Sequence, residues 1–296
     1  MKDKVLVIVG STASGKTGLA VELAMQFNGE VISADSRQVY RGLDIGTAKA
    51  TPGEMQGIPH HCLDVANVDE VYTAKDFVEA GQAAIADITT RGNLPIIAGG
   101  TFFYVDLLLG RATMPEVPPN QTLRTELEAM SAAELFAELR ERDSARAATI
   151  DPNNKRRLVR ALEIIAAVGR VPEIPSEERY DTLWIGIERS REEIRGRIEK
   201  RAQQWLSADF KNEIAWLLEQ NLSPERIAEF GFEYSIGIAW YRGELNDEEF
   251  VEQIIAKNWQ YAKRQLQWLK RNENIHWLTP DKLDTAPVMV TNWLQG

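Results

Sequence analysis

Cysteine and histidine are scarce in this sequence. Cys62 is the one cysteine, which excludes an internal disulfide and fits a reducing compartment. Two of the three histidines, His60 and His61, lie directly before it. Three consecutive residues do not easily face one ion, and outside this segment only His276 could add a His or Cys ligand. We therefore interpret the segment as structural rather than as a metal site.

Long apolar runs are also missing. The first apolar stretch, Val5 to Val9, is too short for the core of a signal peptide or for a membrane span. Internal repeats and low-complexity tracts are absent as well. The 296 residues, 44% of them hydrophobic, are ample for a packed interior. We expect a globular, cytoplasmic protein with no membrane partner.

The chain has no overall excess of positive charge. Its 34 cations and 44 anions give a net charge of −10, which taken alone argues against a nucleic-acid partner. Two local clusters run against this average. Residues 256–272 contain five cations and no acid, and Lys155, Arg156, Arg157 and Arg160 form a second group. Two basic patches on an acidic body are compatible with a directed polyanion site.

Short apolar runs alternate with helical patterns along much of the chain. Strands are predicted at Lys4–Gly10, Glu30–Ser36, Leu94–Thr101, Tyr180–Glu188 and Ile275–Leu278. Helices follow the first strand as far as Phe27, cover Thr73–Thr90, and run from a capping box at Ser190 and Glu193 to about Leu206. This order predicts the α/β class, with a parallel sheet flanked by helices. Ligands of such sheets bind at the carboxyl ends of the strands, where Gly10, Asp35 and Thr101 fall.

A change of character near residue 114 predicts an inserted domain. The proline-rich segment 115–120 leads to helical patterns at Gln121–Met130, Ala132–Arg142 and Asn153–Val168. We therefore divide the chain into a first core segment (1–113), a helical insertion (114–180) and a second core segment (181–296).

The residues between the first strand and its helix match the P-loop pattern G-x4-G-K-[ST]. Main-chain amides, the helix N-terminus and a lysine of such a loop bind phosphate oxygens of ATP or another nucleotide or diphosphate, and its final hydroxyl, Thr17 here, can hold Mg²⁺. A glycine-rich turn without a ligand is the alternative. The predicted phosphate-binding residues are Gly10, Ser11, Thr12, Ala13, Ser14, Gly15, Lys16 and Thr17.

The sequence lacks the second acid that an ATP hydrolase normally places at the end of a neighbouring strand. The strand at Leu94–Thr101 ends in Gly-Gly-Thr, which disfavours ordinary ATPase activity. Asp35 instead opens a segment with a hydroxyl, a guanidinium, an amide and a phenol, Asp35 to Tyr40. Such a loop could hydrogen-bond a base and take a proton from it. The alternative is an aspartate that caps a turn or holds Mg²⁺.

Six motifs stand out along the chain. They are GSTASGKT at 10–17, DSRQVYRGLDIGTAK at 35–49, PHHCLD at 59–64, GGTFFY at 99–104, DPNNKRRLVRALE at 151–163 and YAKRQLQWLKR at 261–271. In combination they resemble the tRNA dimethylallyltransferases. The similarity runs nearly end to end. Nucleotide kinases share only the first motif, and enzymes that prenylate free adenine nucleotides resemble the front half better than the C-terminal basic helix.

The resemblance implies a P-loop NTPase-like fold and transfer of a dimethylallyl group to the N6 amine of the adenosine next to the anticodon, at position 37 of tRNA. By this resemblance the P-loop holds dimethylallyl diphosphate with Mg²⁺, Asp35 is the general base, and Thr101 lies between the donor oxygen and the acceptor amine. Without it, we would interpret Thr101 as a helix cap. The residues implied for tRNA binding are Asp35, Ser36, Arg37, Gln38, Thr101, Arg156, Arg157, Leu158, Val159, Arg160, Lys263 and Arg264.

The basic C-terminal helix can be interpreted from its own periodicity. Ile255, Trp259, Ala262, Leu266 and Leu269 form a predicted core-facing stripe, opposite a basic and aromatic face of Lys257, Tyr261, Arg264, Trp268 and Arg271. Such a face suits nucleic acid, although it could also be merely solvated.

The chain departs from the family at two positions. Trp259 and Ser235 stand where many members have an arginine, and a cation at 235 could help neutralise diphosphate. Three alternatives stay open: a P-loop kinase, a non-catalytic RNA-binding module, and a prenyltransferase that acts on free AMP or ATP. We expect a monomer.

Overall fold

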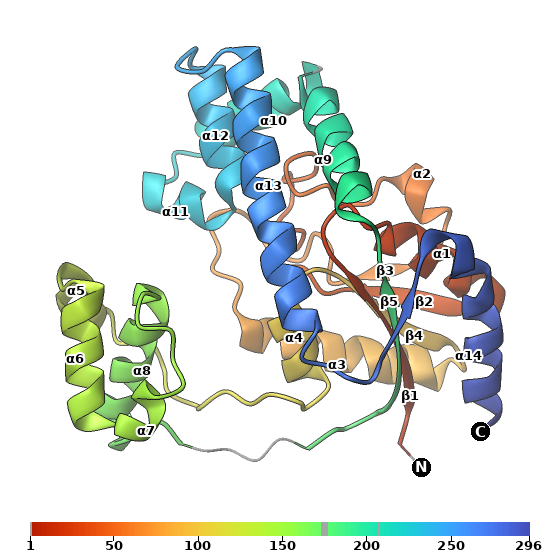
Figure 1. The fold of residues 1–296 in the computed structure, drawn as a ribbon, viewed down its shortest axis with the longest axis horizontal. Coiled ribbons are helices and arrows are strands. Elements are labelled where there is room, and N and C mark those ends of the chain that lie inside the picture. Colours follow the sequence, from red (N-terminus) through yellow and green to blue (C-terminus); the bar gives the residue numbers. More distant parts are fainter. Residues whose placement is uncertain (1, 173–176, 207) are drawn as a thin grey trace. The chain divides into compact units, whose positions relative to one another are not determined.

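The computed structural model describes residues 2–172, 177–206 and 208–296 and contains two compact units (Figure 1). One unit combines Met1–Leu109 with Glu178–Gly296 and is called the core below. The other, Gly110–Glu177, is called the helical unit and occupies the region where the sequence predicts an insertion at 114–180.

A parallel sheet of six strands forms the centre of the core (Figure 1). Its order is β3-β2-β4-β1-β5-β6, and every pairing is parallel. This confirms the predicted α/β class. The strands are β1 (Lys4–Gly10), β2 (Gly29–Ser33), β3 (His60–His61), β4 (Leu94–Ala98), β5 (Asp181–Ile187) and β6 (Ile275–Leu278). The sequence did not predict β3, because two histidines give no apolar pattern.

The strands β2 and β4 end earlier than predicted, at Ser33 and Ala98 rather than Ser36 and Thr101. The segments that follow these two strands then lie close together, because Thr101 N donates to Ala34 O at 3.0 Å. A Cβ atom on Gly99 would lie 2.2 Å from Ala34 O, so only glycine fits there. Asp35 and Thr101 therefore lie in loops beyond the strands, both at the carboxyl edge of the sheet.

Helices cover both faces of the sheet. Helix α1 (Lys16–Phe27) and the C-terminal α14 (Ala286–Gln295) bury their apolar residues on one face. The apolar residues of α3 (Ala74–Thr90) and α4 (Phe102–Leu108) pack on the other, together with Leu269. Two short elements, α2 (Pro52–Met55) and the 3₁₀ helix η1 (Pro280–Thr285), complete these layers.

A group of helices from the second core segment packs around the loops at the carboxyl edge. It consists of α9 (Arg191–Trp205), α10 (Ala208–Glu219), α11 (Pro224–Glu229), α12 (Phe232–Tyr241) and α13 (Asp247–Leu269). Val39, Tyr40 and Leu43 of the loop after β2 are buried among these helices. Ala13 of the P-loop packs against apolar residues of α9 and α13. The helices therefore fix the loops that the sequence singles out.

The helical unit has its own small core. It contains α5 (Gln121–Ala129), α6 (Ala132–Arg142), α7 (Ser144–Ala147) and α8 (Lys155–Val168). Buried Glu163 joins α8 to α5, because Arg124 donates to both of its carboxylate oxygens, at 2.9 and 3.1 Å. In neither unit is any helix of the described residues long and apolar enough to cross a membrane.

Candidate active site

The P-loop, residues 10–17, forms the turn from β1 into α1. Ser11 and Ser14 are each 1% exposed, and among the described residues their hydroxyls have no hydrogen-bond partner. The Lys16 ammonium turns back on the loop and donates to Ser11 O at 2.8 Å. Buried hydroxyls are normally satisfied, and these lie beside the N-terminus of α1, where anions bind. The loop therefore fits a phosphate or diphosphate group.

The lysine and threonine of the P-loop have different surroundings. Burial lowers the pKa of Lys16 to about 8, although the nearby charge of Asp35 acts in the opposite direction. Thr17 is exposed in the first turn of α1. Its hydroxyl, beside a loop that fits phosphate oxygens, suits Mg²⁺, which prefers oxygen ligands and shares them with bound phosphates.

Three arginines converge on the P-loop from the chain after β5. Arg189 Nε donates to Ser14 O at 2.7 Å, and Arg197 Nε donates to Ala13 O at 2.6 Å. Arg201, one helical turn beyond Arg197, donates to the Thr12 hydroxyl at 3.4 Å. Burial and its cationic neighbour Arg197 lower the pKa of Arg201. Mutually repelling cations around a phosphate loop indicate an anionic ligand of high charge.

The sequence interpretation missed these arginines. The available signal was an arginine next to a strand end followed by an i, i+4 pair on one helix face. They also bear on Ser235, which is exposed on α12, because cations from α9 stand near the phosphate loop without an arginine at 235.

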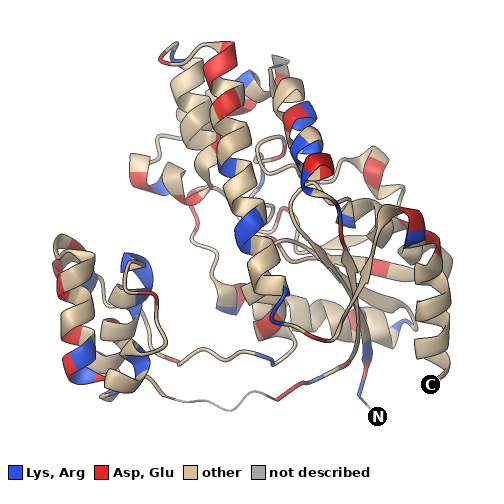
Figure 2. Cartoon of the chain, in the orientation of Figure 1, with Lys and Arg blue, Asp and Glu red and all other residues tan. Residues whose placement is uncertain are grey.

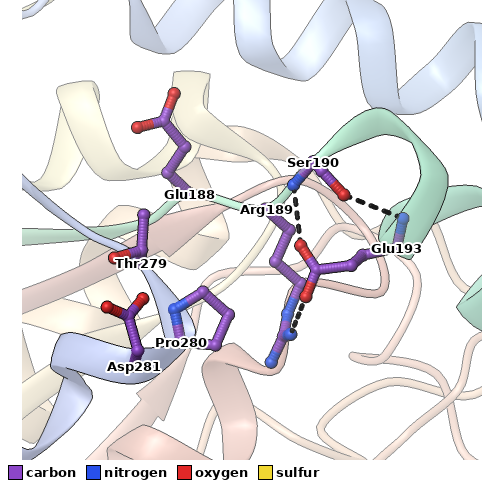
Figure 3. A pocket seen from close by; sticks show the side chains of 7 residues that line it. All are labelled: Glu188, Arg189, Ser190, Glu193, Thr279, Pro280 and Asp281. Carbon is purple, nitrogen blue, oxygen red and sulfur yellow. Dashed lines mark hydrogen bonds and ion pairs between the residues drawn. The ribbon is translucent and has the colours of Figure 1, made fainter.

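An open pocket of about 550 Å³ lies on the other side of Arg189, between the ends of β5 and β6 (Figure 3). Glu193 accepts from Arg189 at 3.2 Å and from Ser190 N at 2.9 Å, so its carboxylate completes the capping box of α9. The residues lining the pocket are Glu188, Arg189, Ser190, Glu193, Thr279, Pro280 and Asp281. Three carboxylates against one guanidinium make this lining unsuited to a second phosphate.

The loop after β2 is folded back on the Asp35 carboxylate. Asp35 Oδ1 accepts from the main-chain nitrogens of Arg37 at 2.9 Å and Gln38 at 3.4 Å. One oxygen of Asp35 thus caps the turn, as the alternative interpretation expected. The Gln38 amide donates to the carbonyls of Thr47 and Ala48, and its oxygen accepts from Ser33. Gln38 is therefore engaged within the loop.

Thr101 stands at the N-cap position of α4, but within the described residues its hydroxyl makes no cap hydrogen bond. Instead Thr101 Oγ1 accepts from Ser36 N at 3.0 Å and lies 3.4 Å from the Ser36 hydroxyl. The ends of β2 and β4 are thereby joined, and Thr101 lies beside the Asp35 turn.

Helix α13 contributes two residues that the sequence interpretation did not assign to the site. Gln265, 5% exposed, accepts from Thr12 N at 2.7 Å and donates to Gly100 O at 3.1 Å. Tyr261 is half-buried, its ring 5.7 Å from the Arg37 guanidinium carbon, and burial and Asp35 raise its pKa to about 12. Gln265 therefore links the P-loop to the Gly-Gly-Thr turn, and Tyr261 faces the Asp35 loop.

The predicted stripe of α13 needs correction. Ala262 and Leu269 are buried as expected, but the buried line also includes Ile254, Asn258 and Gln265. Trp268, expected on the exposed face, is half-buried and donates to Asp106 at 3.2 Å. The prediction that Tyr261 lies on the exposed face was wrong in the same way. Helix α13 packs against α9, α12 and the end of β1 together and so buries more than one of its sides.

The charged residues of α13 separate along the helix, with acids near its start and bases toward its end (Figure 2). Lys263 and Arg264 are exposed there, beside the rings of Trp259 and Tyr261. Trp259 packs against the apolar cluster that contains Ala13 of the P-loop, as expected of a packing residue.

The remaining predicted RNA contacts lie in the helical unit. Arg156 and Arg157 are exposed on α8, whereas Arg160 donates to Val117 O at 2.7 Å and pairs with Glu163. Leu158 and Val159 are 0% and 5% exposed and pack in the core of this unit. This corrects the expectation that their side chains meet RNA, because an i, i+3, i+4 stripe turns them inward.

Comparisons with known proteins agree with this geometry. The model of a family described as IPP transferase matches residues 38–272. A tRNA dimethylallyltransferase of Thermomicrobium roseum is 40% identical over 93% of this chain and 86% of its own length. The crystal structure of a tRNA isopentenylpyrophosphate transferase from Bacillus halodurans superposes with a TM-score of 0.74 at 32% identity, covering 100% of this chain and 97% of that one. A eukaryotic dimethylallyltransferase acting on tRNA gives a TM-score of 0.82 at 29% identity, covering 98% and 77%.

Proposed function

Since the chain belongs to the IPP transferase family, we propose that it transfers a dimethylallyl group from dimethylallyl diphosphate to the N6 amine of the adenosine next to the anticodon, at position 37 of tRNA. The observation that carries this assignment is the meeting of two sites in the core. The P-loop and its arginines form a site for a polyanion, and Gln265 joins that loop to the turn that precedes Thr101. The residues proposed to bind the donor and the acceptor therefore lie at the same carboxyl edge of the sheet.

The donor half of the site binds and stabilises the leaving group. The oxygens of a diphosphate would be bound by main-chain amides at the start of α1, the buried hydroxyls of Ser11 and Ser14, and the ammonium of Lys16. The guanidinium of Arg201 adds charge on the side of Thr12. Charge builds on the bridging oxygen as its bond to the allylic carbon breaks, and groups held ready for that charge usually supply the largest share of catalysis.

Magnesium is part of this proposal. The Thr17 hydroxyl would hold Mg²⁺ together with diphosphate oxygens, and the ion would supply further neutralisation of the leaving group.

The acceptor half activates a poor nucleophile. The lone pair of an adenine amine is delocalised into the ring, so the amine must lose a proton as its nitrogen bonds to the allylic carbon. Asp35 is the proposed base: Oδ1 is held by the turn, and the carboxylate takes the N6 proton while diphosphate departs. A positioned general base contributes typically about 10² to 10⁴-fold. Thr101, tied to Ser36, would keep its proton and donate a hydrogen bond from its hydroxyl to the departing oxygen.

The basic residues outside this centre would hold the RNA. An unpaired anticodon-loop adenosine can leave its stack at less cost than a base in a duplex. Lys263 and Arg264 of the core, and Arg156 and Arg157 of the helical unit, are exposed and suited to phosphates of the anticodon stem-loop. We also propose that the enzyme is a monomer, and its tRNA substrate implies a cytoplasmic enzyme.

The test is transfer of label from radiolabelled dimethylallyl diphosphate, with Mg²⁺, to unmodified tRNA and in parallel to AMP and ATP. Label in tRNA alone is the expected result. Label only in the free nucleotides would leave the donor site right and the acceptor wrong. No transfer, together with ATP consumption in the absence of any prenyl donor, would instead favour a P-loop kinase. Binding of tRNA without any product would favour a non-catalytic RNA-binding module.

A further inference from the structure

The start of α12 places a buried carboxylate against the Asp35 loop. Glu233 is 5% exposed, and its Oε2 accepts from Arg37 Nη1 at 2.8 Å. The reaction proposed above makes no use of Glu233. A buried carboxylate that is paired with an arginine is costly to keep unless its pairing has a purpose.

The Arg37 guanidinium is confined on several sides. Its central carbon lies 5.7 Å from the ring centres of both Phe232 and Tyr261. A Cβ atom on Gly231, where φ is +124°, would lie 2.4 Å from Nη1, so a larger residue at 231 would displace the guanidinium. Arg37 is therefore anchored by α12 and α13 together.

The same residue holds the proposed base. The main-chain nitrogen of Arg37 donates to Asp35 Oδ1 at 2.9 Å, two residues back along the turn. Arg37 therefore connects Glu233 to Asp35. Its side chain is bonded to Glu233, and its main-chain nitrogen donates to the Asp35 carboxylate. Movement of the guanidinium would therefore be transmitted to the turn.

We propose that Glu233 is a positioning residue, which pins Arg37 and thereby holds Asp35 in place for the acceptor amine. This inference rests on the proposed function. Small displacements of a reacting group are expensive: a misplacement of about 1 Å can cost about 10²-fold in rate.

The surroundings of Glu233 add a pH dependence. Burial raises the pKa of Glu233 to about 7, with the guanidinium of Arg37 acting against it and the charge of Asp35 adding to it. Arg201 of α9 also faces this carboxylate, as do the phenols of Tyr234 and Tyr261. Glu233 is ionised above pH 7 and takes a proton below it, so its grip on Arg37 weakens as the pH falls through 7.

The central variant is Glu233→Gln, which keeps the shape and removes the charge. We expect turnover on tRNA about 10- to 100-fold lower, KM for dimethylallyl diphosphate unchanged within twofold, and loss of a wild-type acid limb near pH 7. Glu30→Gln is the matched control, a buried carboxylate bonded to Arg91 at the opposite end of β2, and should keep wild-type turnover and pH profile.

Hydrogen exchange gives a readout that needs no activity. Main-chain amides of Arg37 and Gln38 should exchange faster in Glu233→Gln than in the wild type, because both donate to Asp35. Wild-type turnover, pH profile and exchange in Glu233→Gln would overturn the proposal while the enzyme's function stands. If the wild type itself transfers no label, the proposed function fails and exchange decides: faster exchange supports the anchoring, and unchanged exchange overturns it.

A second pair of variants covers a folding failure of Glu233→Gln. The double variant Arg37→Met with Glu233→Gln leaves no unpaired charge and is compared with Arg37→Met alone. Equal turnover supports an action of Glu233 through Arg37. A further 10-fold loss in the double variant would overturn it.

Discussion

The side chain of Gln265 accepts a hydrogen bond from the main-chain nitrogen of Thr12 at 2.7 Å, across 253 residues of sequence. The same amide donates to Gly100 O, so one residue of α13 spans the two loops proposed to bind the leaving group and the acceptor. Replacing Gln265 with leucine leaves Thr12 N and Gly100 O without this hydrogen-bond partner. The expected loss is about 1–3 kcal/mol of unfolding free energy, measured by urea titration, with a raised KM for the donor. Gln267→Leu, exposed on the same helix, is the control; equal losses would contradict the bridging role.

Asp35→Asn removes the proposed base and leaves an amide of nearly the same shape. The rate constant of transfer in a single-turnover assay should fall by about 10²-fold or more, whereas the dissociation constant for tRNA should stay nearly unchanged. Asp69→Asn, an exposed carboxylate, should match the wild type in both. Near-normal turnover of Asp35→Asn would reject the assigned base.

Arg201→Gln should weaken binding of inorganic diphosphate, because it removes a half-buried charge beside Thr12. Hydrogen bonds to charged groups contribute about 1.5–3 kcal/mol, which corresponds to roughly 10- to 100-fold in affinity. Calorimetry measures this directly. Arg195→Gln, on an exposed position of the same helix, should bind as the wild type does, and a similar loss there would point to overall charge rather than to a site.

Lys16 should give diphosphate binding an alkaline limit. The charged form binds the anion, and with a pKa of about 8 the free lysine loses its proton as the pH rises past 8, so affinity should fall above that value. Titrations between about pH 6.5 and 9.5 would be compared with Lys16→Arg, whose guanidinium stays charged throughout. Ionisation of diphosphate itself affects both proteins equally, so it cancels in the difference between their curves of affinity against pH. Parallel curves would contradict the role of the Lys16 charge in binding.

Glu30 should stabilise the core in a pH-dependent way. Burial alone would raise its pKa, but hydrogen bonds from His61 and Asn93 and the charge of Arg91 lower the pKa below 4.5. A depressed pKa means that the stabilisation is present above 4.5 and fades as the pH falls below it. Glu30→Gln should therefore cost about 1–3 kcal/mol near pH 7 and less at pH 4. Denaturant curves at both values measure this, and a constant difference would refute it.

Much of the fold could be predicted because its signals are local. Continuous apolar runs mark the buried strands β1 and β4, and a capping box marks the start of α9. The ends of β2 and β4 could not be placed, because they are set by a contact between Ala34 and Gly99, which are distant in sequence.

The candidate site divides in the same way. The P-loop is a contiguous motif with a mechanism of its own, so its residues could be named from sequence. Gln265 and Glu233 could not, because each acts through a partner more than a hundred residues away. A polar residue in a helical pattern carries no mark of the loop it will meet.

The hydrogen bond from Arg179 N to Leu109 O, at 3.0 Å, brings together the two points where the core chain departs and returns. The strands of the core therefore pair without any residue of the helical unit. Under the proposed function, a change in the length or sequence of that unit would alter the RNA contacts of Arg156 and Arg157 and leave the residues proposed for the chemistry in place.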